Sequence, residues 1–263
     1  MINESLVKYL AGLLDADGHL SFDFHRGYDD RARLSLKMGL VAADCIDTNG
    51  FVANLSKLTG LGNNTKQYGK YNQWHICHRA DLEMLLPRLI KHMVIKAQHW
   101  QWMLGIWRDY RSQERGSRSM SEEESRALSK ACTESRKLRV GPIHPKNHPT
   151  WAWLAGYLDG DGCYSFRTSR NHNMRLSVTA HVTDLSCLEF LQKHFGGTIR
   201  MNSRTENVRV WWRGLGPRDR SFALDFLSNI VGHAQFKRHK IEQMIHYHRQ
   251  RLSVSGAAAQ ATV

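Results

Sequence analysis

The sequence predicts an α+β protein made of two pseudo-symmetric repeats, each with the element order α-β-β-α-β-β-α. Three observations predict this class. A nine-residue motif occurs twice, each motif is followed by the same series of strand-like and helix-like segments, and a polar stretch separates the two halves. Because neighbouring strand segments are joined by short connections, each repeat is expected to form an antiparallel sheet.

Each element follows from its local pattern. Helices are predicted where apolar residues recur at helical spacing, and strands where apolar and polar residues alternate. The first half has a predicted helix over residues 4–15, strands over 18–25 and 31–40, a helix over 46–58, strands over 63–68 and 71–77, and then two helices. The second half has a predicted helix over 150–159, strands over 163–170 and 174–182, a helix over 185–195, strands over 198–203 and 208–212, and then helices.

The repeat is visible in the residues themselves. Residues 10–18 read Leu-Ala-Gly-Leu-Leu-Asp-Ala-Asp-Gly, and residues 154–162 read Leu-Ala-Gly-Tyr-Leu-Asp-Gly-Asp-Gly. A shift of 144 residues superposes these motifs, and a shift of 141 residues farther along places Lys96 on Lys237. Motif order and spacing are therefore kept in both halves, which indicates an internal repeat.

Composition sets the domain boundaries. We expect an N-terminal repeat over residues 1–115, a linker over 116–147, a C-terminal repeat over 148–252 and a disordered tail over 253–263. The linker is rich in Ser, Arg and Glu and contains Gly-Pro and His-Pro pairs, although residues 122–137 within it have the pattern of a surface helix. The tail is small and polar, which is typical of a disordered terminus.

The chain is strongly basic. It has 37 Lys plus Arg against 24 Asp plus Glu, a formal net charge of +13 and a sequence pI near 9.8. An excess of this size favours an anionic partner, and nucleic acid fits better than a membrane surface because the bases are spread over strand segments. There is no secretory leader pattern and no apolar run long enough to span a bilayer, so we expect an intracellular protein of a bacterial cytoplasm or an organelle. Five cysteines without a Cys-x-x-Cys pair argue against a disulfide framework and a thiolate zinc site.

The polar face of the predicted strands is rich in bases and hydrogen-bonding groups. A solvated face usually mixes charge signs, whereas these strands carry several bases and few acids. Such a face suits the major groove of a duplex, where side chains reach both phosphates and base edges. The predicted DNA-binding residues are Arg33, Ser35, Lys37, Arg167, Arg175, Ser177, Thr179, Arg200, Asn202, Arg204, Arg209, Trp211 and Arg213.

Small residues form a stripe on each motif helix. Gly12 and Ala16 lie one turn apart, as do their repeats Gly156 and Gly160. Two such stripes allow close packing of the helix backbones, and pseudo-twofold symmetry then brings Asp17 near its repeat at the same end.

Two carboxylates at neighbouring helix C-termini, Asp17 and Asp161, repel each other and meet the negative ends of both helix dipoles. A divalent cation relieves this repulsion. Mg²⁺ prefers one or two carboxylates with water and phosphate oxygens, and the backbone carbonyls of Ala16 and Gly160 are expected to complete the site.

The two motifs resemble the eponymous motif of the LAGLIDADG homing endonucleases. Residues 10–18 differ from it only at Leu14, and residues 154–162 differ at Tyr157, Leu158 and Gly160. The chain is similar to a single-chain, two-repeat member of that family. The resemblance implies a monomer in which two antiparallel sheets form a DNA-binding saddle.

The resemblance also implies an activity and a set of site residues. It implies Mg²⁺-dependent hydrolysis of both strands of a long, roughly pseudo-palindromic DNA target, which leaves 3′ overhangs. Asp17 and Asp161 would bind metal, Lys96 and Lys237 would lie near the scissile phosphates, and His181 would position water. Four residues would be structural parts of the motif: Gly12, Asp15, Gly156 and Asp159. Gly39, at the position equivalent to His181, implies unequal active sites that cut the two strands at different rates.

Other functions fit parts of this pattern. An RNA-binding maturase that assists intron splicing uses the same fold, and a catalytically silent DNA-binding regulator would be expected to lose an acid or a lysine. Neither loss is visible. A small-molecule enzyme with paired aspartates would not account for the positive charge or the basic strands.

Overall fold

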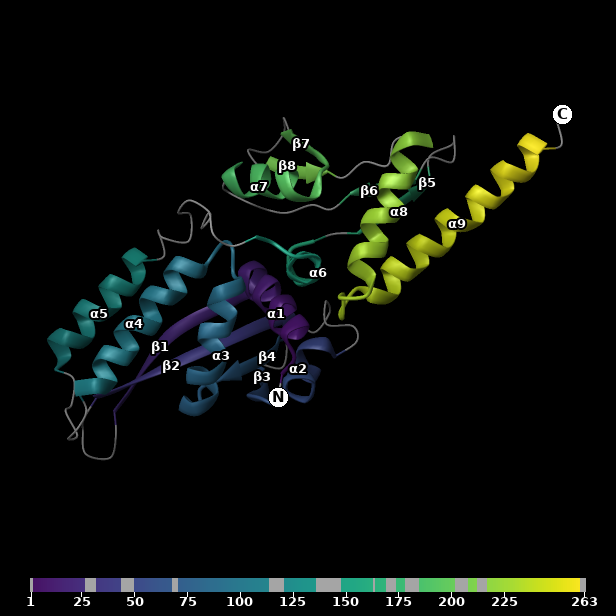
Figure 1. Cartoon of the computed structure of the whole chain (residues 1–263). Coiled ribbons are helices and arrows are strands. Elements are labelled where there is room, and N and C mark those ends of the chain that lie inside the picture. The colour runs from purple at the N-terminus through teal and green to yellow at the C-terminus, as the bar shows by residue number, and fades with distance from the viewer. Residues whose placement is uncertain are drawn as a thin grey trace.

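The structure is a computed structural model that describes residues 2–26, 32–43, 50–67, 71–113, 121–135, 148–162, 164–168, 174–177, 185–201, 208–211 and 217–260. In the first half and linker the elements are α1 (Glu4–Asp17), β1 (Gly18–Arg26), β2 (Ala32–Ala43), α2 (Phe51–Thr59), β3 (Asn63–Gln67), β4 (Tyr71–Ile76), α3 (Arg79–His92), α4 (Ala97–Gln113) and α5 (Glu122–Ser135). In the second half they are α6 (Trp151–Gly160), β5 (Ser165–Thr168), β6 (Met174–Ser177), α7 (Leu185–Phe195), β7 (Thr198–Met201), β8 (Val208–Trp211), α8 (Pro217–Val231) and α9 (Arg238–Gln260). This is the predicted α+β order, repeated twice (Figure 1).

The two motif helices, α1 and α6, lie at the centre of the molecule. Each begins at a side-chain cap, because Asn3 accepts a hydrogen bond from the Leu6 N–H at 2.8 Å and the Thr150 hydroxyl accepts one from the Trp153 N–H at 3.2 Å. From Tyr9 to Asp15 helix α1 is buried on nearly every side, as is α6 from Ala152 to Asp159, whereas Asp17 at the end of α1 is exposed. A helix that is apolar all round belongs in a core, and here one continuous core includes residues of both halves.

The first half forms a four-stranded antiparallel sheet with the strand order β1-β2-β4-β3. In β2, Leu36, Met38 and Leu40 are buried, whereas Ser35 and Lys37 are partly exposed. This is the alternation that the sequence predicts, with one face toward the core and one toward solvent. The helices α2 and α4 contact the sheet, and α3 packs against both α1 and α4.

The second half shows the same strand order in part. Among the described residues, β5 pairs with β6 and β7 pairs with β8, each as an antiparallel two-stranded unit, and β6 lies near β8. The nearness of β6 and β8 matches the pairing of β2 with β4 in the first half. One four-stranded sheet is thus described in place of the two that were expected, since residues 178–184 and 202–207 lie outside the described ranges.

Two helices differ from the sequence expectation. Helix α1 continues to Asp17, two residues beyond its predicted end. Helix α9 continues to Gln260, into the segment that was predicted to be disordered. The three alanines before Gln260 explain this extension, because alanine has the highest helix propensity. The linker contains the expected surface helix as α5, and no helix in the described part of the chain is long and apolar enough to cross a membrane.

Candidate active site and nucleic-acid interface

The glycine stripes bring α1 and α6 into backbone contact. A Cβ atom built on Gly12 would lie 1.8 Å from the Trp153 carbonyl oxygen, and one built on Gly156 would lie 1.9 Å from the Tyr9 carbonyl oxygen. Neither distance leaves room for a methyl group. The two glycines therefore set how closely the helices of the two halves approach.

This packing places Asp17 beside the end of α6. A Cβ atom on Gly160 would lie 3.0 Å from Asp17 Oδ2, so this glycine leaves space for the carboxylate. Asp161, the next residue, is the C-cap of α6 and donates its N–H to the Tyr157 carbonyl oxygen at 3.0 Å. Asp17 of the first motif thus lies against Gly160, the residue just before Asp161 in the second motif.

Charge and burial act on Asp17 in opposite directions. Partial burial of the carboxylate raises the pKa of Asp17, whereas the positive charges of Lys96 and Lys237 lower this pKa. One lysine from each half therefore contributes to the electrostatic potential at this acid.

Both lysines lie at the C-terminal ends of the motif helices. Lys96 Nζ donates to the carbonyl oxygens of Leu14, Ala16 and Gly18 at 3.0, 2.8 and 2.9 Å. Lys237 Nζ donates to the carbonyl oxygens of Leu158, Gly160 and Gly162 at 2.9, 3.2 and 2.6 Å. These acceptors are equivalent under the shift of 144 residues. Each ammonium group binds carbonyl oxygens at the end of its motif helix and counters the negative end of the helix dipole, although the Leu14 and Leu158 carbonyls also accept a backbone N–H.

The first acid of each motif binds the turn that carries the lysine. Asp15 is 2% exposed and accepts from the N–H groups of Val94 at 2.7 Å and Lys96 at 2.8 Å. Burial raises the pKa of Asp15, and these two hydrogen bonds lower it.

Asp159 is 3% exposed and accepts from the N–H groups of Gln235, Phe236 and Lys237 at 2.9, 2.9 and 3.0 Å. Both acids therefore bind the backbone of the turn that carries the lysine and connect it to the end of their own motif helix.

Each of these two carboxylates also accepts a hydrogen bond from an aromatic residue of the opposite half. The Trp153 indole N–H on α6 donates to Asp15 Oδ2 at 2.9 Å, and the Tyr9 hydroxyl on α1 donates to Asp159 Oδ2 at 2.8 Å. The sequence prediction did not include these two residues. A signal was present, because Tyr9 and Trp153 coincide under the shift of 144 and both can donate a hydrogen bond.

A histidine lies over Gly39 on the polar face of the first sheet. Gly39 pairs with His19 in β1 and with His75 in β4, and a Cβ atom on Gly39 would lie 2.9 Å from His19 Cε1. Burial and then the charge of Lys37 lower the pKa of His75, while Asp23 raises it. The small residue at position 39 therefore makes room for an imidazole from the neighbouring strand.

The predicted DNA-binding residues fall into two groups. Ser35 and Lys37 are partly exposed on the polar face of β2, and Arg33 pairs with His25 at the far end of the same ladder. In the second half, Ser177, at the end of β6, pairs with Ser165. Five predicted site residues lie outside the described residues: Thr179, His181, Asn202, Arg204 and Arg213.

The second half places arginines opposite one another. Arg167 pairs with Arg175 in the β5–β6 ladder, and Arg200 pairs with Arg209 in the β7–β8 ladder, where Trp211 pairs with Thr198.

The donor set fits a cation that takes part of its coordination from a substrate. Among the described residues, no group of three or more His, Cys, Asp or Glu side chains is arranged to hold a metal ion. Two carboxylates, Asp17 and Asp161, are the number that Mg²⁺ commonly uses alongside water and phosphate oxygens. The carbonyl oxygens of Ala16 and Gly160 already accept a lysine N–H, and each has a second lone pair.

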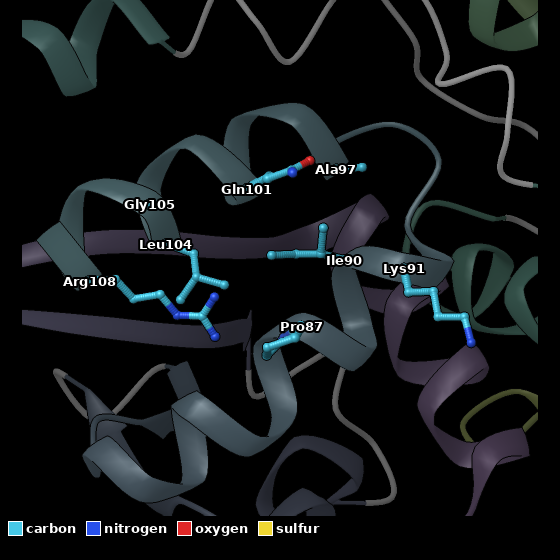
Figure 2. Close-up of a pocket in the computed structure, with 8 residues that line it drawn as sticks. All are labelled: Pro87, Ile90, Lys91, Ala97, Gln101, Leu104, Gly105 and Arg108. Carbon is cyan, nitrogen blue, oxygen red and sulfur yellow. The ribbon is translucent and has the colours of Figure 1, made fainter.

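A surface pocket of about 530 Å³ lies elsewhere, between α3 and α4. Figure 2 shows the eight residues that line it, of which Lys91 and Arg108 are the charged ones. Lys91 is exposed there, whereas Lys96, five residues later, is buried at the end of α1. The lining residues that the structure describes include no carboxylate.

Comparison with known proteins identifies related sequences and folds. Residues 154–214 match the family model described as LAGLIDADG endonuclease. A protein of Debaryomyces hansenii described as "Probable intron-encoded endonuclease aI2" is 33% identical over 57 residues, which are 22% of this chain and 8% of that protein. The chain thus matches less than a tenth of the length of this relative.

Solved structures share the fold of nearly the whole chain. The LAGLIDADG homing endonuclease I-GzeII in complex with its DNA target is 16% identical, with a TM-score of 0.68 over 97% of this chain and 92% of that one. I-SmaMI bound to cleaved DNA is 16% identical, with a TM-score of 0.64 over 95% and 90% of the two chains. I-SmaMI bound to uncleaved DNA in the presence of calcium ions is 17% identical, with a TM-score of 0.58 over 85% and 84%.

Proposed function

We propose that the chain is a LAGLIDADG endonuclease that cuts DNA at a specific site, because residues 154–214 match that family model and both halves carry the motif. It hydrolyses both strands of a long, roughly pseudo-palindromic duplex and leaves 3′ overhangs. It acts as a monomer, with the strands of its two halves forming a saddle over the DNA. Its net charge of +13 supports a polyanionic substrate.

One observation carries the proposal: the same constellation occurs at the ends of two helices in backbone contact. In each half an acid stands at the C-terminal end of a motif helix, with Asp17 as the last residue of α1 and Asp161 as the C-cap of α6, and a lysine ammonium donates to the carbonyls at that end. A duplicated site of this kind suits a reaction that takes place twice, once on each DNA strand.

The residues of the site have separate roles in the proposal. Asp17 and Asp161 would hold Mg²⁺ or another divalent cation, with help from the second lone pairs of the Ala16 and Gly160 carbonyls. A cation held there would polarise the scissile phosphate and stabilise the leaving 3′ oxygen.

Lys96 and Lys237 add fixed positive charge beside the acids. Negative charge that develops on the phosphate is stabilised by such preorganised groups, which do not need to reorganise during the reaction. His181 positions water in the second half. The first half has Gly39 with His19 above it, so the two half-sites are unequal and the two strands are cut at different rates.

Recognition of the target rests on the strands. Arg33, Ser35 and Lys37 of β2 contact one half of the target. The paired arginines of β5 to β8, with Ser177 and Trp211, contact the other half together with Thr179, Asn202, Arg204 and Arg213. Arginine pairs bidentately with guanine and asparagine with adenine, so these residue types read bases as well as phosphates.

Cleavage of duplex DNA tests the proposal directly. Incubation with a duplex that spans the uninterrupted insertion site of the host gene, with Mg²⁺ and then with EDTA, should give metal-dependent cutting of both strands. Asp17→Asn or Asp161→Asn should reduce cutting by on the order of a thousandfold while leaving DNA binding intact, because each variant removes a charged metal ligand without removing the basic strands.

The other outcomes separate the alternatives. Binding of the wild-type protein without cutting would support a silent regulator, and splicing of the host intron RNA would support a maturase. Full cleavage by either aspartate variant would contradict the assignment of the acids.

A further inference from the structure

The two half-sites are connected crosswise by buried hydrogen bonds. The backbone of each lysine turn is bound by the first acid of its own motif, Asp15 for Lys96 and Asp159 for Lys237. Each acid in turn accepts from an aromatic residue of the opposite half. Each lysine turn is therefore linked, through one carboxylate, to the motif helix of the other half.

We propose that Tyr9 and Trp153 are positioning residues for the half-site opposite their own. Tyr9, in the first half, orients Asp159 and through it the turn that carries Lys237. Trp153, in the second half, orients Asp15 and through it the turn that carries Lys96. This inference rests on the proposed function, because position matters here for the lysine beside a scissile phosphate.

Burial makes this connection rigid. Tyr9 is 2% exposed and Trp153 is 1% exposed, so water cannot replace either donor. Trp153 is further held by stacking on Tyr157, with ring centroids 5.3 Å apart and planes 13° apart. Hydrogen bonds to a charged acceptor are among the stronger ones in a protein, and a carboxylate that loses one can reorient.

The Asp159 carboxylate connects the Tyr9 hydroxyl to the backbone of the Lys237 turn. Asp159 Oδ2 accepts from Tyr9 and also from the N–H groups of Gln235 and Phe236, while Oδ1 accepts from Lys237. A change at Oδ2 therefore alters the plane of the carboxylate and with it the Lys237 backbone. The Lys237 ammonium, which donates to the end of α6, follows its backbone.

Tyr9→Phe tests the inference with little structural change. The ring stays in the core, and only the hydroxyl is removed. Tyr164→Phe is a matched control, because Tyr164 is 1% exposed, belongs to the same core and has a hydroxyl without a hydrogen-bond partner among the described residues. Lys96→Ala and Lys237→Ala identify which DNA strand depends on which lysine.

Single-turnover rates on a duplex labelled on both strands give the first measurement. Tyr9→Phe should slow the strand that Lys237→Ala slows, by about tenfold, and leave the other strand within about twofold, so that nicked DNA accumulates. Trp153→Phe should slow the strand that depends on Lys96. Tyr164→Phe should slow neither. The inference would be overturned if Tyr9→Phe slowed cleavage of both strands equally. It would also be overturned if Lys96→Ala and Lys237→Ala slowed cleavage of the same strand.

Amide hydrogen exchange gives a measurement that does not need activity. In Tyr9→Phe, the amides of Gln235, Phe236 and Lys237 should exchange faster, whereas those of Val94 and Lys96 should not change. An equal change in both turns, or in neither, would overturn the inference. If the wild-type protein cut no DNA, the proposed function would fail while this exchange pattern still decided whether the crossed connection exists.

Discussion

The helix ends and the strands differ in how closely the two halves agree. At the helix ends, Lys96 and Lys237 donate to three carbonyl oxygens each, at positions related by the same shift. In the strands, the alignment places Gly39 on His181 and His19 on Cys163, so equivalent positions carry different chemistry. The lysine contacts at the helix ends are duplicated, whereas the strand position proposed to hold water differs between the two halves. Under the proposed function, the two half-sites therefore share the lysine contacts and differ in how water is held.

The largest expected loss of stability comes from substitutions in the contact between α1 and α6. Gly12→Ala or Gly156→Ala puts a methyl group within 2 Å of a backbone oxygen, at 1.8 and 1.9 Å respectively. Because a backbone atom cannot move away as a side chain can, each variant should lower the free energy of unfolding by about 4 kcal/mol or more, or prevent folding. Urea denaturation measures this change.

A glycine in open space is the matched control. Gly105 lies in α4, and nothing lies within 4 Å of a Cβ atom built on it. Gly105→Ala should stabilise the protein by up to about 1 kcal/mol, because alanine has the higher helix propensity. A small loss at only one of Gly12 and Gly156 would show that the helix contact is not symmetric.

Removal of either motif-end lysine, Lys96 or Lys237, should cause a smaller loss of stability. Lys96 is 9% exposed, whereas Lys237 is only half-buried. Lys96→Met removes three hydrogen bonds to carbonyl oxygens at a buried helix end and should lower the free energy of unfolding by about 2 to 3 kcal/mol. Lys237→Met should lower it by about 1 to 2 kcal/mol, since water reaches the second site. The exposed Lys91→Met should change it by less than about 0.5 kcal/mol. An equal loss at both sites would contradict the difference in burial.

The smallest expected effect is on DNA recognition by the strands of the second half. Arg200→Ala or Arg209→Ala should weaken DNA binding and relax preference at one base pair by about 1 to 3 kcal/mol, in one half of the target only. Binding to a set of singly substituted duplexes measures this. Lys130→Ala, on the exposed surface of α5, should leave the preference unchanged. An unchanged profile in the arginine variants would make these residues phosphate contacts.

The order of helices and strands could be predicted because it depends on local patterns. The alternation in β2 and the small residues on α1 and α6 are visible in single segments, and their packing follows from elementary geometry. The pairing of Lys96 with Lys237 was visible as a second internal alignment. Their contacts with the carbonyls at the motif helix ends were not, because these contacts depend on where the α3–α4 and α8–α9 turns meet α1 and α6.

The crossed hydrogen bonds could not be predicted for a related reason. Tyr9 and Trp153 differ in shape and donor atom, so their equivalence is not visible as an identity in the alignment. Only the crossing of α1 over α6 brings each one to the acid of the other half. The helical end of α9 was missed because a short alanine run was outweighed by the small, polar composition around it.

The glycine contact between α1 and α6 has a consequence for how new specificities arise. Two backbones without space for a methyl group between them cannot slide along each other. Under the proposed function, the contact between α1 and α6 therefore fixes the offset between the cuts on the two DNA strands. Substitutions on the sheets change which sequence is bound. The length of the overhang stays constant, and strand surfaces can be redesigned independently of it.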